Sequence, residues 1–336
     1  MTGRRPRKLA VAPASVAEAT TDPAPFAVLT PDFVLDAIES VGLRPDGRQL
    51  ALNSYENRVY QIGVEDAAIL EEHGFTAELA EREIPVAVPL LIDGRTLHRH
   101  AGLRFALLPR LSGRAPELSD PATLEWMGRF IGRIHAVGAL RPFVARPALD
   151  IASFGEASRD WLLQHDFIPA DVLPAWRSSV EQALDGVRRA FDRAGRVRPL
   201  RLHGDCHLGN VLWQADERAP FVGPQFVDFD DARMGPAVQD LWMLLSGERD
   251  EMSRQLADVL AGYEDFMEFS PRELHLLEAL RTLRLLHYSA WLARRWDDPA
   301  FPAAFPWFNT QRYWQDRVLE LREQIALMDE PPLRPA

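Results

Sequence analysis

The hydrophobic positions of the first hundred residues alternate between helical and strand-like spacing. Apolar residues recur every three or four positions over residues 31–40 and 67–83, which predicts two amphipathic helices. Several short apolar runs, bounded by polar or glycine-containing turns, have the length and composition of strands. They cover residues 49–52, 58–62, 86–92 and 103–108. This part of the chain therefore predicts a small α+β lobe with an antiparallel sheet.

Beyond residue 117 the hydrophobic pattern is mainly helical. Residues 109–116 include two prolines, a glycine and a serine, which is typical of a linker. Two later segments each have an apolar face, and a leucine-rich stretch over 274–296 predicts a buried central helix. The two faces consist of Leu124, Met127, Phe130, Ile131 and Ile134, and of Val180, Ala183, Leu184, Val187 and Phe191. We expect a disordered tail at 1–28, a small lobe at 29–108, the linker, and a large helical lobe at 117–332.

Composition narrows the possible partners and the compartment. The 336 residues are 47% hydrophobic and 26% charged, as in globular proteins. A net charge of −11 argues against a nucleic-acid or anionic-membrane surface, and no apolar run reaches the roughly 20 residues that span a membrane. Cys206 is the only cysteine, so no internal disulfide can form, and we expect a cytoplasmic protein. We also expect a monomer, because the chain has no coiled-coil pattern.

Three polar residues beside apolar runs indicate phosphoryl-transfer chemistry. Asp205 precedes Asn210 by five positions, in a loop that ends at the apolar run 211–213. In kinases this spacing separates a carboxylate that orients or deprotonates the acceptor hydroxyl from an asparagine that binds magnesium. Asp228 follows Asn210 by 18 positions, a distance over which a hairpin can return its carboxylate to the metal. The three residues predict an ATP- and Mg²⁺-dependent phosphotransferase.

Two other interpretations of this stretch are open. Aspartate, asparagine and glycine favour turns, so a plain surface turn would contain the same residue types. His203, Cys206 and His207 could instead bind zinc, although the chain has no second cysteine. We favour the phosphotransferase, because three residues in the required order each lie beside an apolar strand. In a kinase-like loop His203 would be structural and would hydrogen-bond the backbone.

Longer matches resemble a known superfamily. The segments 203–210 and 228–233 are similar to the aminoglycoside phosphotransferase superfamily. Within it, the chain resembles the bacterial stress-response serine/threonine kinases from about residue 29 to residue 332, most clearly at 52–60, 235–242 and 291–307. The resemblance implies a two-lobed, protein-kinase-like α+β fold. Its small antiparallel-sheet lobe would bind the nucleotide, the linker would be the hinge, and the larger helical lobe would be catalytic.

The resemblance also assigns roles to individual residues. It implies that Asp205 and Asp228 are the catalytic carboxylates, with Asp205 as the proton acceptor. Asn210 and Asp228 would bind Mg²⁺, and Ser54 would contact an ATP phosphate. Asp240 would hold the catalytic loop from a neighbouring helix. The implied acceptor is a serine or threonine of a protein.

One part of the family pattern is missing. In kinase-like lobes a helix carboxylate, here Glu72 or Glu71, orients a strand lysine that contacts the ATP phosphates. Only residues 63–66 separate the second strand from the helix, and Lys8 in the tail is the only lysine. The lysine-bearing strand therefore has no place in the small lobe. An internal segment could have been lost, the protein could be a degenerate kinase, or Arg58 or another arginine could replace the lysine. We expect slower phosphate transfer than in relatives with the lysine.

Two alternative functions are also open. A kinase of amino alcohols or aminosugars would suit an acidic acceptor site, and a pseudokinase that binds a nucleotide or a partner would suit the missing lysine. A C-terminal aromatic cluster could line a substrate groove, although aromatic side chains at helical spacing usually belong to the core. The cluster consists of Tyr288, Trp291, Trp296, Phe301, Phe305, Trp307, Tyr313 and Trp314. We expect it to be core.

Overall fold

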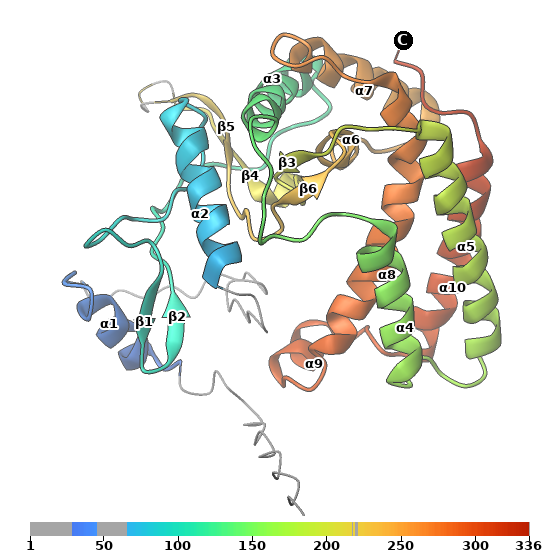
Figure 1. Cartoon of the computed structure of the whole chain (residues 1–336), viewed down its shortest axis with the longest axis horizontal. Helices are drawn as coiled ribbons and strands as arrows, with labels where there is room; N and C mark the ends of the chain where they lie inside the picture. Colours follow the sequence, from blue (N-terminus) through green and yellow to red (C-terminus); the bar gives the residue numbers. More distant parts are fainter. Residues whose placement is uncertain (1–28, 46–65, 217, 219–220, 336) are drawn as a thin grey trace, which may run out of the picture.

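The computed structural model describes residues 29–45, 66–216, 218 and 221–335 (Figure 1). The first two predicted helices are present as α1 (Pro31–Glu39) and α2 (Asp66–Glu81). The Thr30 hydroxyl accepts a hydrogen bond from the Phe33 N–H at 3.2 Å, and Pro31 lies in the first turn, where no N–H is needed. The strands predicted at 49–52 and 58–62 and the predicted tail lie outside the described residues.

A short antiparallel hairpin lies beside α1 (Figure 1). It consists of β1 (His98–His100) and β2 (Leu103–Phe105), with His98 opposite Phe105. Ala101 and Gly102 form the turn with φ angles of 45° and 84°, the left-handed values that a two-residue hairpin turn requires. The hairpin therefore contains only the first half of the strand predicted at 103–108.

The strand predicted at 86–92 is wrong. Within the described residues this stretch has only isolated bridges, including a parallel bridge between Val86 and Phe226. Pro85 directly precedes the run and Pro89 interrupts it, and proline cannot donate a hydrogen bond to a strand ladder. The backbone here bonds to the later strand that contains Phe226. The Leu90 N–H donates to the Leu107 carbonyl oxygen at 2.7 Å, but the described residues 86–92 and 103–108 form no strand ladder.

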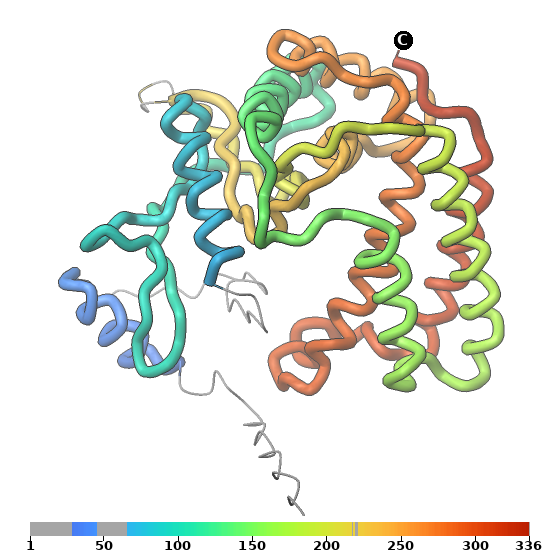
Figure 2. Tube along the Cα trace, in the orientation of Figure 1, coloured from blue at the N-terminus to red at the C-terminus, as the bar shows by residue number. Residues whose placement is uncertain are grey.

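The larger part of the described chain is helical (Figures 1 and 2). Its helices are α3 (Pro121–Gly138), α4 (Ala157–Gln164), α5 (Leu173–Ala194), α6 (Val238–Trp242), α7 (Arg249–Tyr263), α8 (Leu277–Arg294), α9 (Ala300–Ala304) and α10 (Gln311–Asp329). A π-helical turn (Ile151–Glu156) precedes α4, and a 3₁₀ turn (Pro271–Leu276) precedes α8, the predicted central helix. The two predicted apolar faces are buried on α3 and α5, except that Phe191 is partly exposed. None of the described helices is long and apolar enough to span a bilayer.

Helices α3 and α7 approach each other so closely that glycine is required at the contact. A Cβ at Gly128 on α3 would lie 1.9 Å from the Val259 carbonyl oxygen. A Cβ at Gly262 on α7 would lie 1.9 Å from the Glu125 carbonyl oxygen. The two glycines therefore allow the backbones of the two helices to touch.

Two short antiparallel strand pairs lie between the helices. They are β3 (Leu200–Leu202) with β6 (Arg233–Gly235), and β4 (Val211–Gln214) with β5 (Gly223–Phe226). The loop 203–210 runs from β3 to β4, and the loop 227–232 runs from β5 to β6. Each loop runs from one strand pair to the other, and the strands within each pair are antiparallel. The two loops therefore lie at the same end of the two pairs.

The predicted linker is tied to this strand system. The Arg114 N–H donates to the Trp213 carbonyl oxygen at 3.1 Å, and the Trp213 N–H donates to the Arg114 carbonyl oxygen at 2.6 Å. These two bonds form an antiparallel bridge between the linker and β4. The linker therefore has a defined position along the edge of the β4–β5 hairpin.

Candidate active site

The loop after β3 is held by the buried carboxylate of Asp240, on α6. Its oxygens accept hydrogen bonds from the backbone N–H groups of His203 at 2.8 Å and Gly204 at 2.9 Å. His135 Nε2 lies 3.0 Å from the same carboxylate. Gly204 has a φ of +88°, and a Cβ there would lie 2.1 Å from the Asp231 carbonyl oxygen. Asp240 thus holds the loop after β3, as the resemblance implied. Gly204, which has no Cβ, allows this loop to approach the 227–232 loop closely.

Both oxygens of the Asp205 carboxylate have partners. Oδ1 accepts a hydrogen bond from Nη1 of Arg284, and Oδ2 lies 3.3 Å from Nε2 of His207. The Gly209 N–H donates to Nδ1 of His207 at 2.9 Å, so Nε2 carries the proton that faces Asp205. Burial raises the pKa of Asp205, but the His207 hydrogen bond and the Arg284 charge outweigh it and lower the pKa to about 2. The carboxylate is therefore ionised at neutral pH, as a proton acceptor must be.

Asn210 ends the same loop, directly before β4. Its Nδ2 donates to the Asp205 carbonyl oxygen at 3.0 Å, which fixes the orientation of the amide. The Val227 N–H donates to the Asn210 carbonyl oxygen at 3.0 Å. The β4–β5 hairpin therefore returns the chain to Asn210 immediately before Asp228, as the spacing predicted. With Nδ2 engaged, the amide oxygen is the atom that a hard cation would bind.

Asp228 has an unusual backbone conformation and an unusual charge environment. Its φ of 63° is left-handed, which aspartate tolerates better than most residues. Burial raises the pKa of Asp228 to about 7; the carboxylates of Asp230, Asp231 and Asp205 add to this effect, and His203 opposes it. A divalent cation would offset the repulsion, and carboxylate and amide oxygens are ligands that suit Mg²⁺. The residues present therefore fit a magnesium ion.

The zinc interpretation of the loop is wrong. His203 Nε2 lies 2.9 Å from the Val227 carbonyl oxygen, as expected for a structural histidine. Cys206 is fully buried, and burial raises the pKa of its thiol well above the ordinary value. Within the part of the chain that the structure describes, no three His, Cys, Asp or Glu side chains are grouped to hold a metal. Asn210 and Asp228, which fit a magnesium ion, are one amide and one carboxylate and therefore do not form such a group of three.

Glu72 on α2 is paired with Arg146, which the sequence analysis did not single out. Glu72 Oε2 lies 3.0 Å from Nη1 of Arg146; burial raises the pKa of Glu72, and the arginine opposes this. The same guanidinium donates to the backbone carbonyl oxygens of Asp230 and Ala232, just after Asp228. Arg146 therefore connects α2 to the Asp228 loop. No local pattern marks it, because these partners are 74 to 86 residues away in the chain.

Glu71 binds the backbone of the segment that contains Arg146, and not the Arg146 guanidinium. Its carboxylate accepts hydrogen bonds from the backbone N–H groups of Val144, Ala145 and Arg146, at 2.7 to 3.0 Å. Of the two carboxylates considered, Glu72 is thus the one connected to the site. Ser54, expected at the ATP phosphates, lies outside the described residues.

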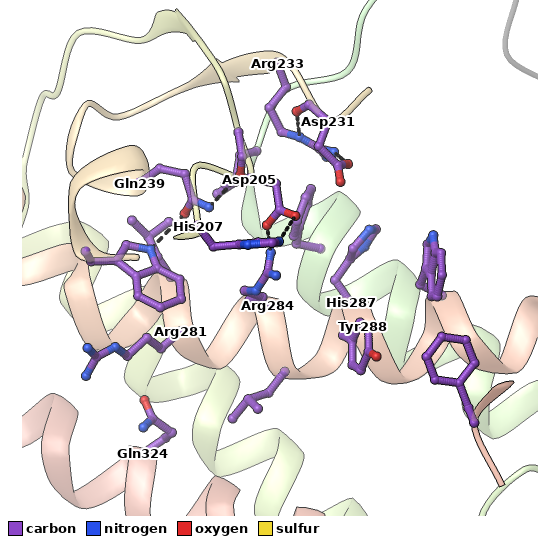
Figure 3. Close-up of a pocket in the computed structure, with 18 residues that line it drawn as sticks. Asp205, His207, Asp231, Arg233, Gln239, Arg281, Arg284, His287, Tyr288 and Gln324 are labelled. Carbon is purple, nitrogen blue, oxygen red and sulfur yellow. Dashed lines mark hydrogen bonds and ion pairs between the residues drawn. The ribbon is translucent and has the colours of Figure 1, made fainter. Parts of the chain in front are cut away.

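A cavity of about 660 Å³ lies beside Asp205, between the loop after β3 and helix α8 (Figure 3). Besides Asp205, its polar lining includes His207 and Arg284, neither of which the sequence analysis placed at an acceptor site. The aromatic cluster is divided. Tyr288, Trp291 and Phe305 line the cavity, whereas Phe301, Tyr313 and Trp314 are buried in the core. The expectation that the whole cluster is core was therefore wrong for these three lining residues and for Trp307, which is 47% exposed.

Comparison with known proteins identifies the family of the chain. Residues 46–277 match the profile of the phosphotransferase enzyme family. Stress response kinase A of Salmonella choleraesuis (strain SC-B67) is 41% identical over 325 residues, covering 92% of this chain and 96% of that protein. Serine/threonine protein kinase RdoA of Salmonella typhimurium (strain LT2) is 40% identical with the same coverage.

The fold is also shared with a solved kinase structure. An amicoumacin kinase in complex with AMP-PNP and Ca²⁺ is similar with a TM-score of 0.57, covering 81% of this chain and 80% of that chain at 17% identity. The expected kinase-like fold, mostly helical with small antiparallel sheets, is thus confirmed. By profile and by overall identity, this chain belongs to the phosphotransferase enzyme family and is a homologue of stress response kinase A.

Proposed function

We propose that this protein transfers the γ-phosphate of ATP to a serine or threonine hydroxyl of a protein. The observation that carries the proposal is the position of Asp205, an ionised carboxylate beside a cavity of about 660 Å³, on the loop that also contains Asn210. The protein acceptor is supported by the 40% identity to serine/threonine protein kinase RdoA.

In the proposed reaction, Asp205 accepts the proton of the acceptor hydroxyl while the hydroxyl oxygen bonds to the γ-phosphorus. The bond between the γ-phosphorus and the oxygen that bridges to the β-phosphate breaks, and ADP leaves. Asn210 and Asp228 would hold Mg²⁺, which when bound neutralises charge on the phosphates. Asp240 keeps the loop of Asp205 in place during this transfer.

The proposed organisation follows the family fold. Residues 29–108 would form the nucleotide-binding lobe, residues 109–116 the hinge and residues 117–332 the catalytic lobe, with residues 1–28 as a tail. Ser54 would contact an ATP phosphate. The protein would act as a cytoplasmic monomer.

We also propose that transfer is slower than in relatives with a small-lobe lysine. Lys8 is the only lysine of the chain, and Glu72 is paired with Arg146. Because the Arg146 guanidinium also binds three backbone carbonyl groups, it is not free to reach a nucleotide. Inserting a lysine-bearing strand between Ile62 and Ala67 should raise the rate.

The test is Mg²⁺-dependent transfer of labelled γ-phosphate to the protein itself and to a generic protein substrate, with Asp205→Ala as control. Transfer that the substitution abolishes, with phosphoserine or phosphothreonine recovered, supports the proposal. Nucleotide binding without transfer would support the pseudokinase alternative. Phosphorylation of an amino alcohol or aminosugar, and of no protein, would change the acceptor class to small molecules.

A further inference from the structure

Arg284 projects from α8 toward the loop after β3 and contacts Asp205 (Figure 3). Its guanidinium binds Oδ1 of the carboxylate, while His207 lies 3.3 Å from Oδ2. The Asp205 side chain is 8% exposed and the Arg284 side chain 39%, and both line the cavity. An acceptor that enters the cavity therefore meets the Arg284 guanidinium beside the carboxylate that it needs.

This ion pair opposes the proposed reaction. The guanidinium occupies space on one oxygen of Asp205, where an acceptor hydroxyl could otherwise donate its hydrogen bond. Productive binding of an acceptor thus requires that Arg284 finds another anionic partner.

The charges of the cavity wall favour an anionic acceptor over a cationic one. The charged lining residues are Asp205, Asp231, Arg233, Arg281 and Arg284. Arg233 is paired with Asp231, and Arg281 is paired with Glu278 at 3.2 Å. Among the three arginines, Arg284 is therefore the one whose ion pair is with Asp205 itself. A polycationic aminosugar would meet this arginine with like charge and could not displace it.

We infer that Arg284 is a positioning residue that selects acceptors with an acidic group beside the hydroxyl. The acceptor anion binds the guanidinium and draws it from Asp205, and the hydroxyl then reaches the carboxylate. The exchange is nearly balanced, because one guanidinium–carboxylate pair replaces another. A neutral acceptor leaves the ion pair in place. The inference rests on the proposed function, since it requires Asp205 as the base, and it specifies the acceptor as a serine or threonine in an acidic segment.

Two peptides test the inference. The first contains one serine flanked by glutamates, and its twin has glutamine at every glutamate position. Binding is measured by fluorescence anisotropy, and phosphorylation is measured by transfer of labelled phosphate. We expect the unmodified chain to prefer the glutamate peptide by roughly tenfold in both affinity and kcat/KM, because charge-assisted pairs are stronger than neutral ones.

Arg284→Gln should remove the preference, so that the two peptides bind equally well and have equal kcat/KM. Arg284→Lys should restore part of it, since the charge returns without the planar fork. Arg294→Gln is the matched control, because Arg294 lies on the same helix over the Trp161 ring and does not line the cavity. A purely structural role of Arg284 would lower transfer to both peptides alike.

Equal binding and equal kcat/KM for the two peptides with the unmodified chain would overturn the inference, and so would a preference that persists in Arg284→Gln. Failure of the proposed function has a different signature. In that case neither the two peptides nor a generic substrate is phosphorylated. The anisotropy measurement alone then decides whether Arg284 binds the acidic group of the peptide.

Discussion

Glu72 on α2 and Arg146 in the segment after α3 form an ion pair with an Nη1–Oε2 distance of 3.0 Å. Their side chains are 15% and 6% exposed, so the pair is largely removed from water. Arg146 also binds the carbonyl oxygens of Asp230 and Ala232. The position of α2 is therefore linked to the loop of the proposed magnesium ligand Asp228. In the family pattern the partner of this carboxylate is a lysine, whereas here it is an arginine.

Replacing Arg146 should destabilise the protein and weaken its response to magnesium. Arg146→Gln leaves Glu72 buried without its cation and removes hydrogen bonds to the Asp228 loop. Breaking a buried pair by removing one partner costs about 3 kcal/mol or more. Urea denaturation measures the loss, and a Mg²⁺ titration of transfer should show a higher half-saturating concentration.

The control for this prediction is Arg141→Gln. Arg141 is 63% exposed and lies 3.1 Å from Glu78, so its loss should change the free energy of unfolding by less than about 1 kcal/mol. If both variants lost the same stability, the Glu72–Arg146 pair would have no special structural role.

Asp228→Asn should separate stability from activity. The substitution removes a carboxylate that burial and neighbouring carboxylates oppose, and asparagine tolerates the φ of 63°. We expect an unchanged or higher Tm in the absence of Mg²⁺, because charge repulsion is relieved. Transfer should fall by roughly 100-fold or more, the usual loss when a preorganised electrostatic group is removed. Thermal unfolding and the labelled-phosphate assay measure the two effects.

The control is Asp216→Asn, at an exposed position, which should change neither the Tm nor the rate of phosphate transfer. Loss of Tm in Asp228→Asn would indicate that the carboxylate stabilises the apo protein, in conflict with its raised pKa.

His73 should make the protein less stable in mild acid. Burial lowers the pKa of His73 to about 4, the charges of Arg146 and His98 add to the effect, and Thr96 Oγ1 lies 2.8 Å from Nδ1. In the unfolded chain the pKa is about 6.5, so the unfolded state binds more protons between pH 6.5 and 4. The free energy of unfolding therefore falls as the pH drops through this window. Thermal melts between pH 7.5 and 4.5 should show the slope.

His73→Asn should remove part of that slope. Another part belongs to His287, because burial lowers its pKa to about 4 as well. The exposed His165→Asn should keep the full pH dependence of the unmodified protein. If the unmodified protein, His73→Asn and His165→Asn all showed the same dependence of Tm on pH, His73 would not contribute to it.

The contact between α3 and α7 should not tolerate a side chain. Gly128→Ala would place a methyl group 1.9 Å from the Val259 carbonyl oxygen, so the helices must separate. We expect a loss of about 3 kcal/mol, at the upper end for overpacked cores. Gly74→Ala, on α2 with no atom within 4 Å of its Cβ, should instead stabilise the protein by about 0.5–1 kcal/mol. Chemical denaturation of the two variants shows whether the effects have opposite signs.

The helices and the order of the site residues were predictable from the sequence alone. The stripe through Leu124, Met127 and Ile134 predicted α3, because a 3.6-residue period depends only on neighbouring positions. The positions of Asp205 and Asn210 came from spacing within one loop. Pro89, within 86–92, could also have excluded a paired strand there, because proline lacks the backbone N–H donor. Each of these features depends on residues that are close in the sequence.

Only the tertiary structure decided which charged groups meet. Arg146 reaches Glu72 across 74 residues of chain, and Arg284 reaches Asp205 across 79. Neither arginine differs in its local sequence from others that lie on the surface. The partner of a charge is selected by which helices and loops pack together, and that packing is the sum of many weak contacts spread over the whole chain. The sequence by itself thus determined the chemistry of the loop at 203–210, whereas the packing of α2 and α8 against it decided its charged partners.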